Sequence, residues 1–247
     1  MLFMVTTALA HQPFVVGDTA GSPDSAFVVE DPDISIVAYA EPSCAHPDVW
    51  LTFAAEPGQE VYFQLGIPVA DTLADWRPRI ALVAPGLPQA DLGFDLPAGT
   101  GAEVFEPATE PSRFDEPFSN TSSWILVEER VVLPEGGPAW LVAWGPDGTV
   151  ARLWVAVGET EAFDADDWDR ILDLMDDVRA FHGADGSEVP APDACDDAPA
   201  EVEAGSDAEA PAGCTTVPLA APGPLLLFAL AAARLRPRAR RAEVESR

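Results

Sequence analysis

Glu60-Val61-Tyr62-Phe63-Gln64-Leu65-Gly66-Ile67 is the stretch from which the fold can be deduced. Its larger aliphatic and phenylalanine side chains, Val61, Phe63, Leu65 and Ile67, occupy every second position. Because successive side chains of a β-strand point to opposite faces, this alternation predicts a strand with one face in a core. A strand that is apolar on one face and more polar on the other is typical of an antiparallel sheet.

The segment before this stretch has the same pattern. Val49, Leu51 and Phe53 also occupy alternate positions, and the link 55–59 contains Pro57 followed by Gly58. Proline and glycine in adjacent positions favour a tight turn. We therefore expect the two segments to form a hairpin.

Short apolar segments separated by Pro, Gly and Asp continue along the chain from residue 26 to residue 157, which predicts an all-β fold. The expected architecture is an antiparallel, jelly-roll-like β-sandwich. The predicted strands are 26–30, 34–40, 49–54, 60–66, 79–84, 102–105, 124–133, 138–144 and 149–157.

The last two predicted strands are joined by Trp144-Gly145-Pro146-Asp147-Gly148-Thr149, which favours a second hairpin. In the expected register, one face holds the core residues Trp140, Val142, Trp144, Ala151, Leu153 and Val155. The opposite face holds Leu141, Ala143, Val150, Arg152, Trp154 and Ala156, and it is too apolar to face water. A shift of one residue would exchange the two faces.

An amphipathic helix is predicted at 164–182, followed by Gly183. Its apolar residues follow the i, i+3, i+4, i+7 spacing of one helix face: Trp168, Ile171, Leu172, Met175 and Val178. Asp164 is the expected N-terminal cap. We expect this helix to pack on the β-domain and to cover the apolar second face of the last hairpin.

Four regions follow from these patterns. Residues 1–10 are expected to be a short signal peptide, because Ala8-Leu9-Ala10 matches a cleavage site. Residues 11–183 form the folded body. Residues 184–212 are rich in Asp, Glu, Ala and Pro with few large apolar residues, which predicts a disordered linker. Residues 213–247 form a separate tail.

The order of residues in the tail is typical of a membrane-targeting segment. Gly213-Cys214 is followed by a largely apolar run, 217–233, and then by an arginine cluster: Arg234, Arg236, Arg238, Arg240 and Arg241. Arginines after an apolar segment hold that flank on the cytoplasmic side, which leaves the body outside. The tail resembles the MYXO-CTERM class of bacterial sorting signals. That resemblance implies processing near Cys214, lipid modification and display on the cell surface by export and sorting machinery. The alternative is a stop-transfer anchor that stays in place.

Cysteine content and charge agree with an exported protein. If Cys214 belongs to the tail, Cys44 and Cys195 are left as an internal disulfide pair. The net charge is −29 and there is no lysine, so a nucleic-acid partner is excluded by repulsion from phosphates. Dispersed carboxylates indicate a solvated surface, with calcium binding as the alternative. No cofactor is predicted from the charge pattern.

His11 would become the first residue after cleavage. A free amino group next to an imidazole is a bidentate copper ligand, with His46 or His182 as a second nitrogen source. In this one residue the chain resembles copper-dependent polysaccharide monooxygenases and periplasmic copper carriers, which implies copper binding. The alternative is an ordinary polar residue before the first strand.

A second candidate site is Asp75-Trp76-Arg77-Pro78-Arg79. Trp76, Arg77 and Arg79 could stack on a sugar or hold a carboxylate. The alternative is that the arginines pair with nearby acids beside a strand.

Hydrolase and phosphate-loop motifs are absent from the sequence, so no catalytic residue is predicted. The body loosely resembles secreted β-sandwich and pre-peptidase-like domains through turns such as Glu56-Pro57-Gly58-Gln59. That resemblance implies a non-catalytic module for binding or structural display at the cell envelope, with a glycan or a protein as partner. The alternatives are a copper-dependent or hydrolytic enzyme and a passive envelope component.

Overall fold

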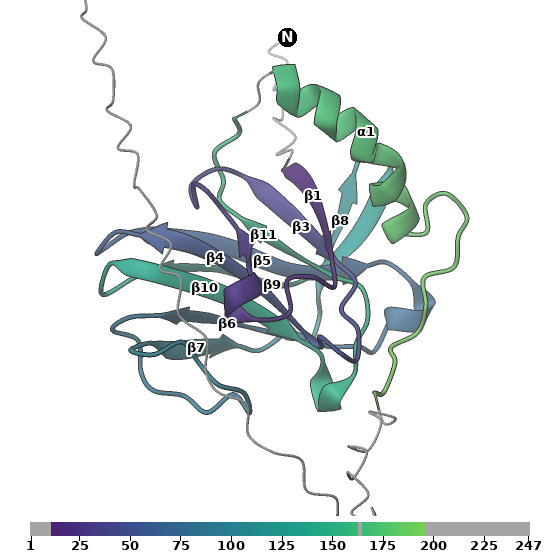
Figure 1. Ribbon diagram of the computed structural model, residues 1–247. Helices are drawn as coiled ribbons and strands as arrows, with labels where there is room; N and C mark the ends of the chain where they lie inside the picture. Colours follow the sequence, from purple (N-terminus) through teal and green to yellow (C-terminus); the bar gives the residue numbers. More distant parts are fainter. Residues whose placement is uncertain (1–10, 163–164, 196–247) are drawn as a thin grey trace, which may run out of the picture. The chain divides into compact units, whose positions relative to one another are not determined.

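The computed structural model describes residues 11–162 and 165–195, and these residues form two mixed β-sheets and one helix (Figure 1). Sheet A contains, in spatial order, β1 (Gln12–Gly17), β3 (Ile36–Ala40), β11 (Leu153–Val157), β5 (Glu60–Pro68), β9 (Thr121–Val132) and β8 (Ser112–Glu116). Sheet B contains β2 (Phe27–Val28), β4 (Asp48–Ala55), β10 (Gly137–Trp144), β6 (Arg79–Ala84) and β7 (Gly101–Phe105). Helix α1 spans Ala165–Phe181, and three short 3₁₀ turns span Pro23–Ser25, Asp71–Leu73 and Pro146–Gly148.

One apolar core is built from both sheets, as in a β-sandwich. Phe63 and Leu65 of β5 are fully buried in it, together with Leu51 of β4 and Leu141 of β10. The alternation seen in the sequence therefore identifies the core faces of β4 and β5 correctly. Burial of so many large apolar side chains is the main stabilising contribution to this fold.

The expectation of purely antiparallel sheets is wrong in two places. β1 pairs with β3 in parallel, and β2 pairs with β4 in parallel. The first five strands alternate between the two sheets, so that β1 and β3 belong to sheet A and β2 and β4 belong to sheet B. A chain that leaves a sheet and returns can enter it again in the same direction, which a tight hairpin does not allow.

Both predicted hairpins are also wrong, and for the same reason. The link 55–59 joins β4 in sheet B to β5 in sheet A, and the link 145–152 joins β10 in sheet B to β11 in sheet A. β10 pairs with β4 and β6, whereas β11 pairs with β3 and β5. Pro and Gly indicate that the chain reverses its direction, but they do not indicate which sheet the next strand joins.

The residues that were expected to share the two faces of the last hairpin therefore lie in different sheets, those of β10 in sheet B and those of β11 in sheet A. Leu153 and Val155 face the core as predicted, but on β10 it is Leu141 and Ala143 that face the core. Val142 lies on the outer face of sheet B. Trp154 and Ala156 lie on the outer face of sheet A, where they form a cluster with Val37 and with Phe181 of α1.

Helix α1 therefore covers the outer face of sheet A, as the apolar character of Trp154 and Ala156 suggested. The expected cap, Asp164, lies outside the described residues.

The folded body extends beyond the predicted boundary at residue 183. Val189 is buried in the main core, and its carbonyl accepts a hydrogen bond of 2.9 Å from Thr72 Oγ1. Val150 and Asp193 form a two-way backbone bridge. Residues 184–195 are thus attached by a few specific contacts that their acidic composition does not indicate, so the predicted linker begins too early.

Residues 1–10 and 196–247 lie outside the described part of the chain, including Gly213, Cys214 and the arginine cluster from Arg234 to Arg241. Within residues 11–162 and 165–195, no helix is long and apolar enough to cross a membrane.

Candidate ligand-binding site

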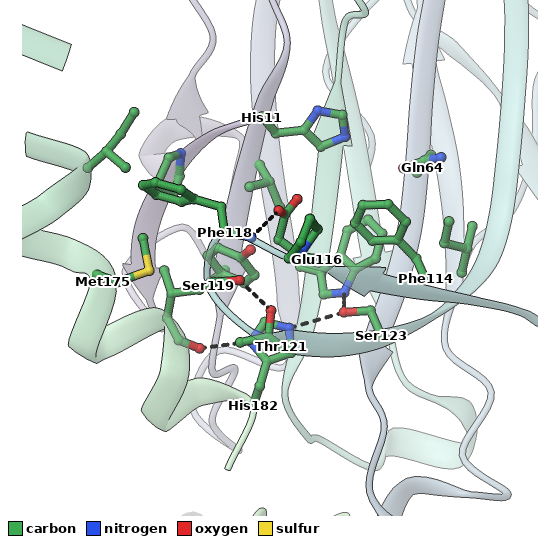
Figure 2. A pocket seen from close by; sticks show the side chains of 18 of the residues that line it. His11, Gln64, Phe114, Glu116, Phe118, Ser119, Thr121, Ser123, Met175 and His182 are labelled. Carbon is green, nitrogen blue, oxygen red and sulfur yellow. Dashed lines mark hydrogen bonds between the residues drawn. The ribbon is translucent and has the colours of Figure 1, made fainter. Parts of the chain in front are cut away.

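A cavity of about 310 Å³ lies between the outer face of sheet A and helix α1, and the β8–β9 hairpin closes it on one side; Figure 2 shows it from close by. Its walls are mainly apolar and aromatic. Six aromatic side chains line it: Tyr39, Tyr62, Phe114, Phe118, Trp154 and Trp168. A concave, largely apolar site with a few polar groups is the usual form of a small-molecule pocket.

A β-bulge in β9 aims several residues into this cavity. The pairing of β5 with β9 shifts by one residue between Leu65 and Gly66, which leaves Leu126 as the extra residue. Leu126 is buried in the core, whereas Ser123 and Ile125 face outward and line the cavity. Bulges re-aim side chains in this way and are common next to functional sites.

Gly66 provides the space for the floor of the cavity. A Cβ atom at this position would lie 2.1 Å from Cζ2 of Trp154, so only glycine allows the indole ring to lie flat against β5. The ring then lines the cavity, and Trp154 Nε1 donates a hydrogen bond of 3.1 Å to Ser123 Oγ.

Ser123 continues this chain of hydrogen bonds to the end of α1. Its hydroxyl lies 3.1 Å from Nε2 of His182, and Nδ1 of His182 lies 2.8 Å from the carbonyl oxygen of Val178. Nδ1 must therefore donate to the carbonyl, and Nε2 accepts from Ser123. Burial lowers the pKa of His182 to about 4, and the positive charge of Arg152 also lowers it, although the bond to Val178 raises it. His182 is thus neutral at pH 7.

The pair of Ser123 and His182 is better suited to hold α1 on sheet A than to attack a substrate. Ser123 is buried, and its oxygen already accepts a hydrogen bond from Trp154. The imidazole is oriented by a backbone carbonyl rather than by a carboxylate. A serine nucleophile needs an accessible oxygen beside its base, and this oxygen is enclosed.

At the other end of the cavity lies His11, as Figure 2 shows. Its Nδ1 is hydrogen-bonded to Ser35 Oγ. Burial lowers the pKa of His11, while a hydrogen bond with Gln64 and the negative charge of Glu161 raise it by less. His11 is therefore also neutral at pH 7, and it adds hydrogen-bonding groups to the cavity without adding charge.

Glu116 is the acidic group on the β8 side of the cavity. It shares one face of β8 with Phe114, because the two residues are two positions apart. Its Oε1 accepts a hydrogen bond of 2.9 Å from the backbone N–H of Phe118. Burial raises the pKa of Tyr39, and the negative charge of Glu116 raises it further. The field of this carboxylate therefore reaches the floor of the cavity.

A second carboxylate at the edge of the cavity, Glu159, is already paired. Arg130 forms a two-pronged ion pair with it, with Nε at 3.2 Å from Oε2 and Nη2 bonded to Oε1. The same guanidinium lies 4.5 Å from the centroid of the Tyr62 ring. Tyr62 also donates a hydrogen bond of 3.0 Å to Glu128.

The mouth of the cavity carries exposed aromatic side chains. Phe114, Phe118 and Trp168 are 39%, 51% and 44% exposed. Phe118 and Trp168 contact each other edge to face across the opening, with centroids 5.9 Å apart. Exposed aromatic groups around a hollow are typical of a binding site rather than of an ordinary surface.

The structure does not bring Trp76, Arg77 and Arg79 together as a binding platform. Trp76 is buried in the main core, and its Nε1 donates a hydrogen bond of 2.9 Å to Thr149 Oγ1. Arg77 bonds the backbone carbonyls of Ala74 and Trp76, and Arg79 forms an ion pair of 3.0 Å with Glu106. The ring of Trp76 is thus covered and cannot stack on a sugar.

The predicted histidine pair is not formed either. His46 is exposed beside Asp18, with Nδ1 at 4.0 Å from Oδ2, and it does not line the cavity that contains His11. His182 does line it, but His11 and His182 lie at opposite ends in Figure 2. In the described part of the chain, no three His, Cys, Asp or Glu side chains form a group that could hold a metal ion.

Cys44 and Cys195 form a disulfide, with their Cα atoms 5.2 Å apart and 151 positions apart in sequence. The bond attaches the end of the described chain to the connection between β3 and β4. A cross-link that closes so long a loop removes much conformational freedom from the unfolded chain.

The most important site residues were missed by the sequence analysis. β8, with Phe114 and Glu116, was not among the predicted strands. Tyr39 and Gln64 lie in the predicted strands 34–40 and 60–66, but neither was predicted to be a site residue. The one available signal was the crowding of aromatic residues near 114–124, which holds Phe114, Phe118 and Trp124.

Comparison with known proteins does not identify the chain: no protein-family model matches it, and no curated protein shows significant similarity to it. The cavity is therefore the feature from which a function can be inferred.

Proposed function

We propose that this protein is a non-catalytic binding module displayed at a bacterial cell surface, and that its ligand is a small molecule with an apolar body. The observation that carries the proposal is the aromatic cavity between sheet A and α1. Its volume of about 310 Å³ falls within the usual range of ligand pockets, roughly 300–1,000 Å³. The polar groups at its ends would orient a ligand.

Display at the surface is supported by several sequence features and by one structural feature. The resemblance of the tail to MYXO-CTERM signals and the apolar start of the chain both favour export. The Cys44–Cys195 disulfide fits an oxidising compartment. The jelly-roll-like connectivity stays a prediction, supported by the repeated passage of the chain between the two sheets.

The binding role can be tested with the neutral fluorescent probe N-phenyl-1-naphthylamine, whose emission rises in apolar surroundings. The full chain is compared with two tryptophan variants of α1. Met175→Trp fills the cavity, because Met175 lines it, whereas Leu172→Trp places the same side chain at a position that is 60% exposed.

We expect saturable binding by the parent protein and by Leu172→Trp, and at least about tenfold weaker binding by Met175→Trp, since a filled pocket loses its apolar contacts. Thermal unfolding would verify that both variants fold. Equal binding by all three proteins would show that the probe binds elsewhere and would refute the proposal.

Display can be tested by measuring the intact mass of the protein from its own cells. A mature chain that starts at His11 and ends at a modified Cys214 would support sorting. A chain that keeps both ends would refute sorting and would mean that the tail is a plain anchor or that the protein is not exported; binding in the cavity would then stand alone.

A further inference from the structure

We propose that the cavity binds an organic cation, namely an alkylammonium or quaternary ammonium group carried on an apolar body. This inference rests on the proposed function, because it names the ligand class for the same cavity. Three features carry it: the aromatic walls, the sign of the charges that line them, and an acidic group that has no cationic partner among the residues that the structure describes.

The walls present ring faces and edges from several directions. Four of the rings belong to strands of sheet A, namely Tyr39 in β3, Tyr62 in β5, Trp154 in β11 and Phe114 in β8, and Phe118 and Trp168 lie at the mouth. The face of an aromatic ring carries negative potential, so that several rings around one volume attract a positive centre. The ring of Tyr62 already has the guanidinium of Arg130 at 4.5 Å, which demonstrates such a contact within the same wall.

Among the described residues, all the formal charges on side chains that line the cavity are negative at pH 7. No arginine side chain in residues 11–162 and 165–195 lines the cavity, the sequence has no lysine, and His11 and His182 are neutral because burial lowers the pKa of each. The charged lining residues are Glu116 and Glu159. An anionic ligand would meet repulsion here and would be repelled further by the net charge of −29.

Glu116 is the group that a bound cation would neutralise. Glu159 is already paired with Arg130, whereas in residues 11–162 and 165–195 no ion pair involves Glu116. Figure 2 shows Glu116 between the labelled rings of Phe114 and Phe118, with its oxygens near the middle of the view. An uncharged apolar ligand would remove water from this carboxylate without replacing its hydrogen bonds, which is unfavourable, whereas a cation would compensate for the loss.

The experiment displaces bound N-phenyl-1-naphthylamine from the full chain with two competitors of the same shape. Benzyltrimethylammonium carries the positive charge, and neopentylbenzene replaces its nitrogen with carbon. Benzenesulfonate serves as the anionic competitor. We expect the cation to displace the probe at about tenfold lower concentration than the neutral molecule, in line with cation–π and charge contributions of roughly 1–2 kcal/mol. Benzenesulfonate should be the weakest of the three.

Two matched variants separate the local carboxylate from the overall charge. Glu116→Gln keeps an acceptor for the N–H of Phe118 but removes the charge from the cavity. Glu129→Gln removes one charge from an exposed position of β9 that does not line the cavity. Affinity for the cation should fall about tenfold in Glu116→Gln and stay unchanged in Glu129→Gln, while affinity for neopentylbenzene stays the same or rises in both.

The outcomes distinguish this inference from the function on which it rests. If the probe binds in the cavity but the charged and neutral competitors are equally effective, or if Glu116→Gln and Glu129→Gln behave alike, the cavity is an apolar pocket and the cation inference is wrong. If Met175→Trp leaves probe binding unchanged, the cavity is not the binding site and both ideas fail.

Discussion

The two outer faces of the sandwich are both aromatic, but one is filled and the other is hollow. On sheet B, the β6–β7 connection lays Phe94 between Trp50 and Trp144, with ring centroids 5.5 Å apart in each pair. On sheet A, helix α1 spans a comparable set of rings and leaves a cavity of about 310 Å³. An apolar outer face therefore does not by itself indicate a binding site.

The nature of the cover accounts for the difference. The segment 85–100 follows the surface of sheet B closely and fills it with Leu92, Phe94 and Leu96. Helix α1 instead contacts sheet A through Phe181 and His182 at its C-terminal end and through Arg170, whose guanidinium lies over the ring of Phe14 in β1, and it leaves the cavity beside these contacts. The polar side chains Glu116, Gln64 and His11 border that space.

The largest loss of stability is expected from a substitution on the filled face, the outer face of sheet B. Trp50 is 2% exposed, and replacing it with alanine removes a side chain packed against Phe94 and the rest of that cluster. We expect Trp50→Ala to lower the free energy of unfolding by about 3–5 kcal/mol, the usual cost of truncating a buried aromatic residue. Chemical denaturation of the parent protein and the variant measures this loss in the free energy of unfolding. A loss below about 1 kcal/mol would mean that this face is as loosely packed as the other.

The next largest effect is a pH-dependent loss of stability at His182, whose hydrogen bonds hold the end of α1 on sheet A. The pKa of His182 is about 4 in the folded protein and 6.5 in the unfolded chain. Between these values the unfolded chain binds the extra proton, so stability is lost as the pH falls from about 6.5 to 4. The shift corresponds to a loss of about 3 kcal/mol in the free energy of unfolding.

Comparison of the parent protein with His182→Gln isolates this contribution. Asp48 acts in the opposite direction, because burial raises its pKa from 3.8 to about 6 and its proton stabilises the fold in acid. Subtracting the variant's stability from that of the parent at each pH cancels Asp48. His46→Gln, at an exposed histidine, is the matched control. A difference between parent and His182→Gln that does not change between pH 7 and 4 would contradict the prediction.

The sequence sufficed for features that depend on periodicity. The alternation of Val61, Phe63 and Leu65 identified a core face, and the apolar character of Trp154 and Ala156 correctly required a helix above them. These predictions succeed because burial on one face imposes a local pattern on the sequence.

Features that depend on distant partners could not be deduced. Nothing around Gly145 or Pro57 specifies that the chain passes to the other sheet, because turn residues record only local geometry. β8 alternates Phe114 and Glu116 with charged neighbours and is too short to produce a clear signal. The bulge at Leu126 depends on the pairing of β9 with β5, so the sequence alone could not predict the bulge or the cavity that the bulge helps to form.

The smallest expected effect is at the mouth of the hollow face. Phe118 is 51% exposed, so truncating it to alanine removes about half of the burial of a phenylalanine side chain, and we expect a loss of about 1 kcal/mol or less in the free energy of unfolding. The same denaturation measurement used for Trp50→Ala provides the comparison. The two variants differ in cost because Phe118 contacts Trp168 on one side and solvent on the other, whereas Trp50 is enclosed. A loss of 3 kcal/mol or more in Phe118→Ala would mean that the mouth is closed in solution. The hollow face would then be a second filled face, and a ligand could reach the cavity only if α1 moved.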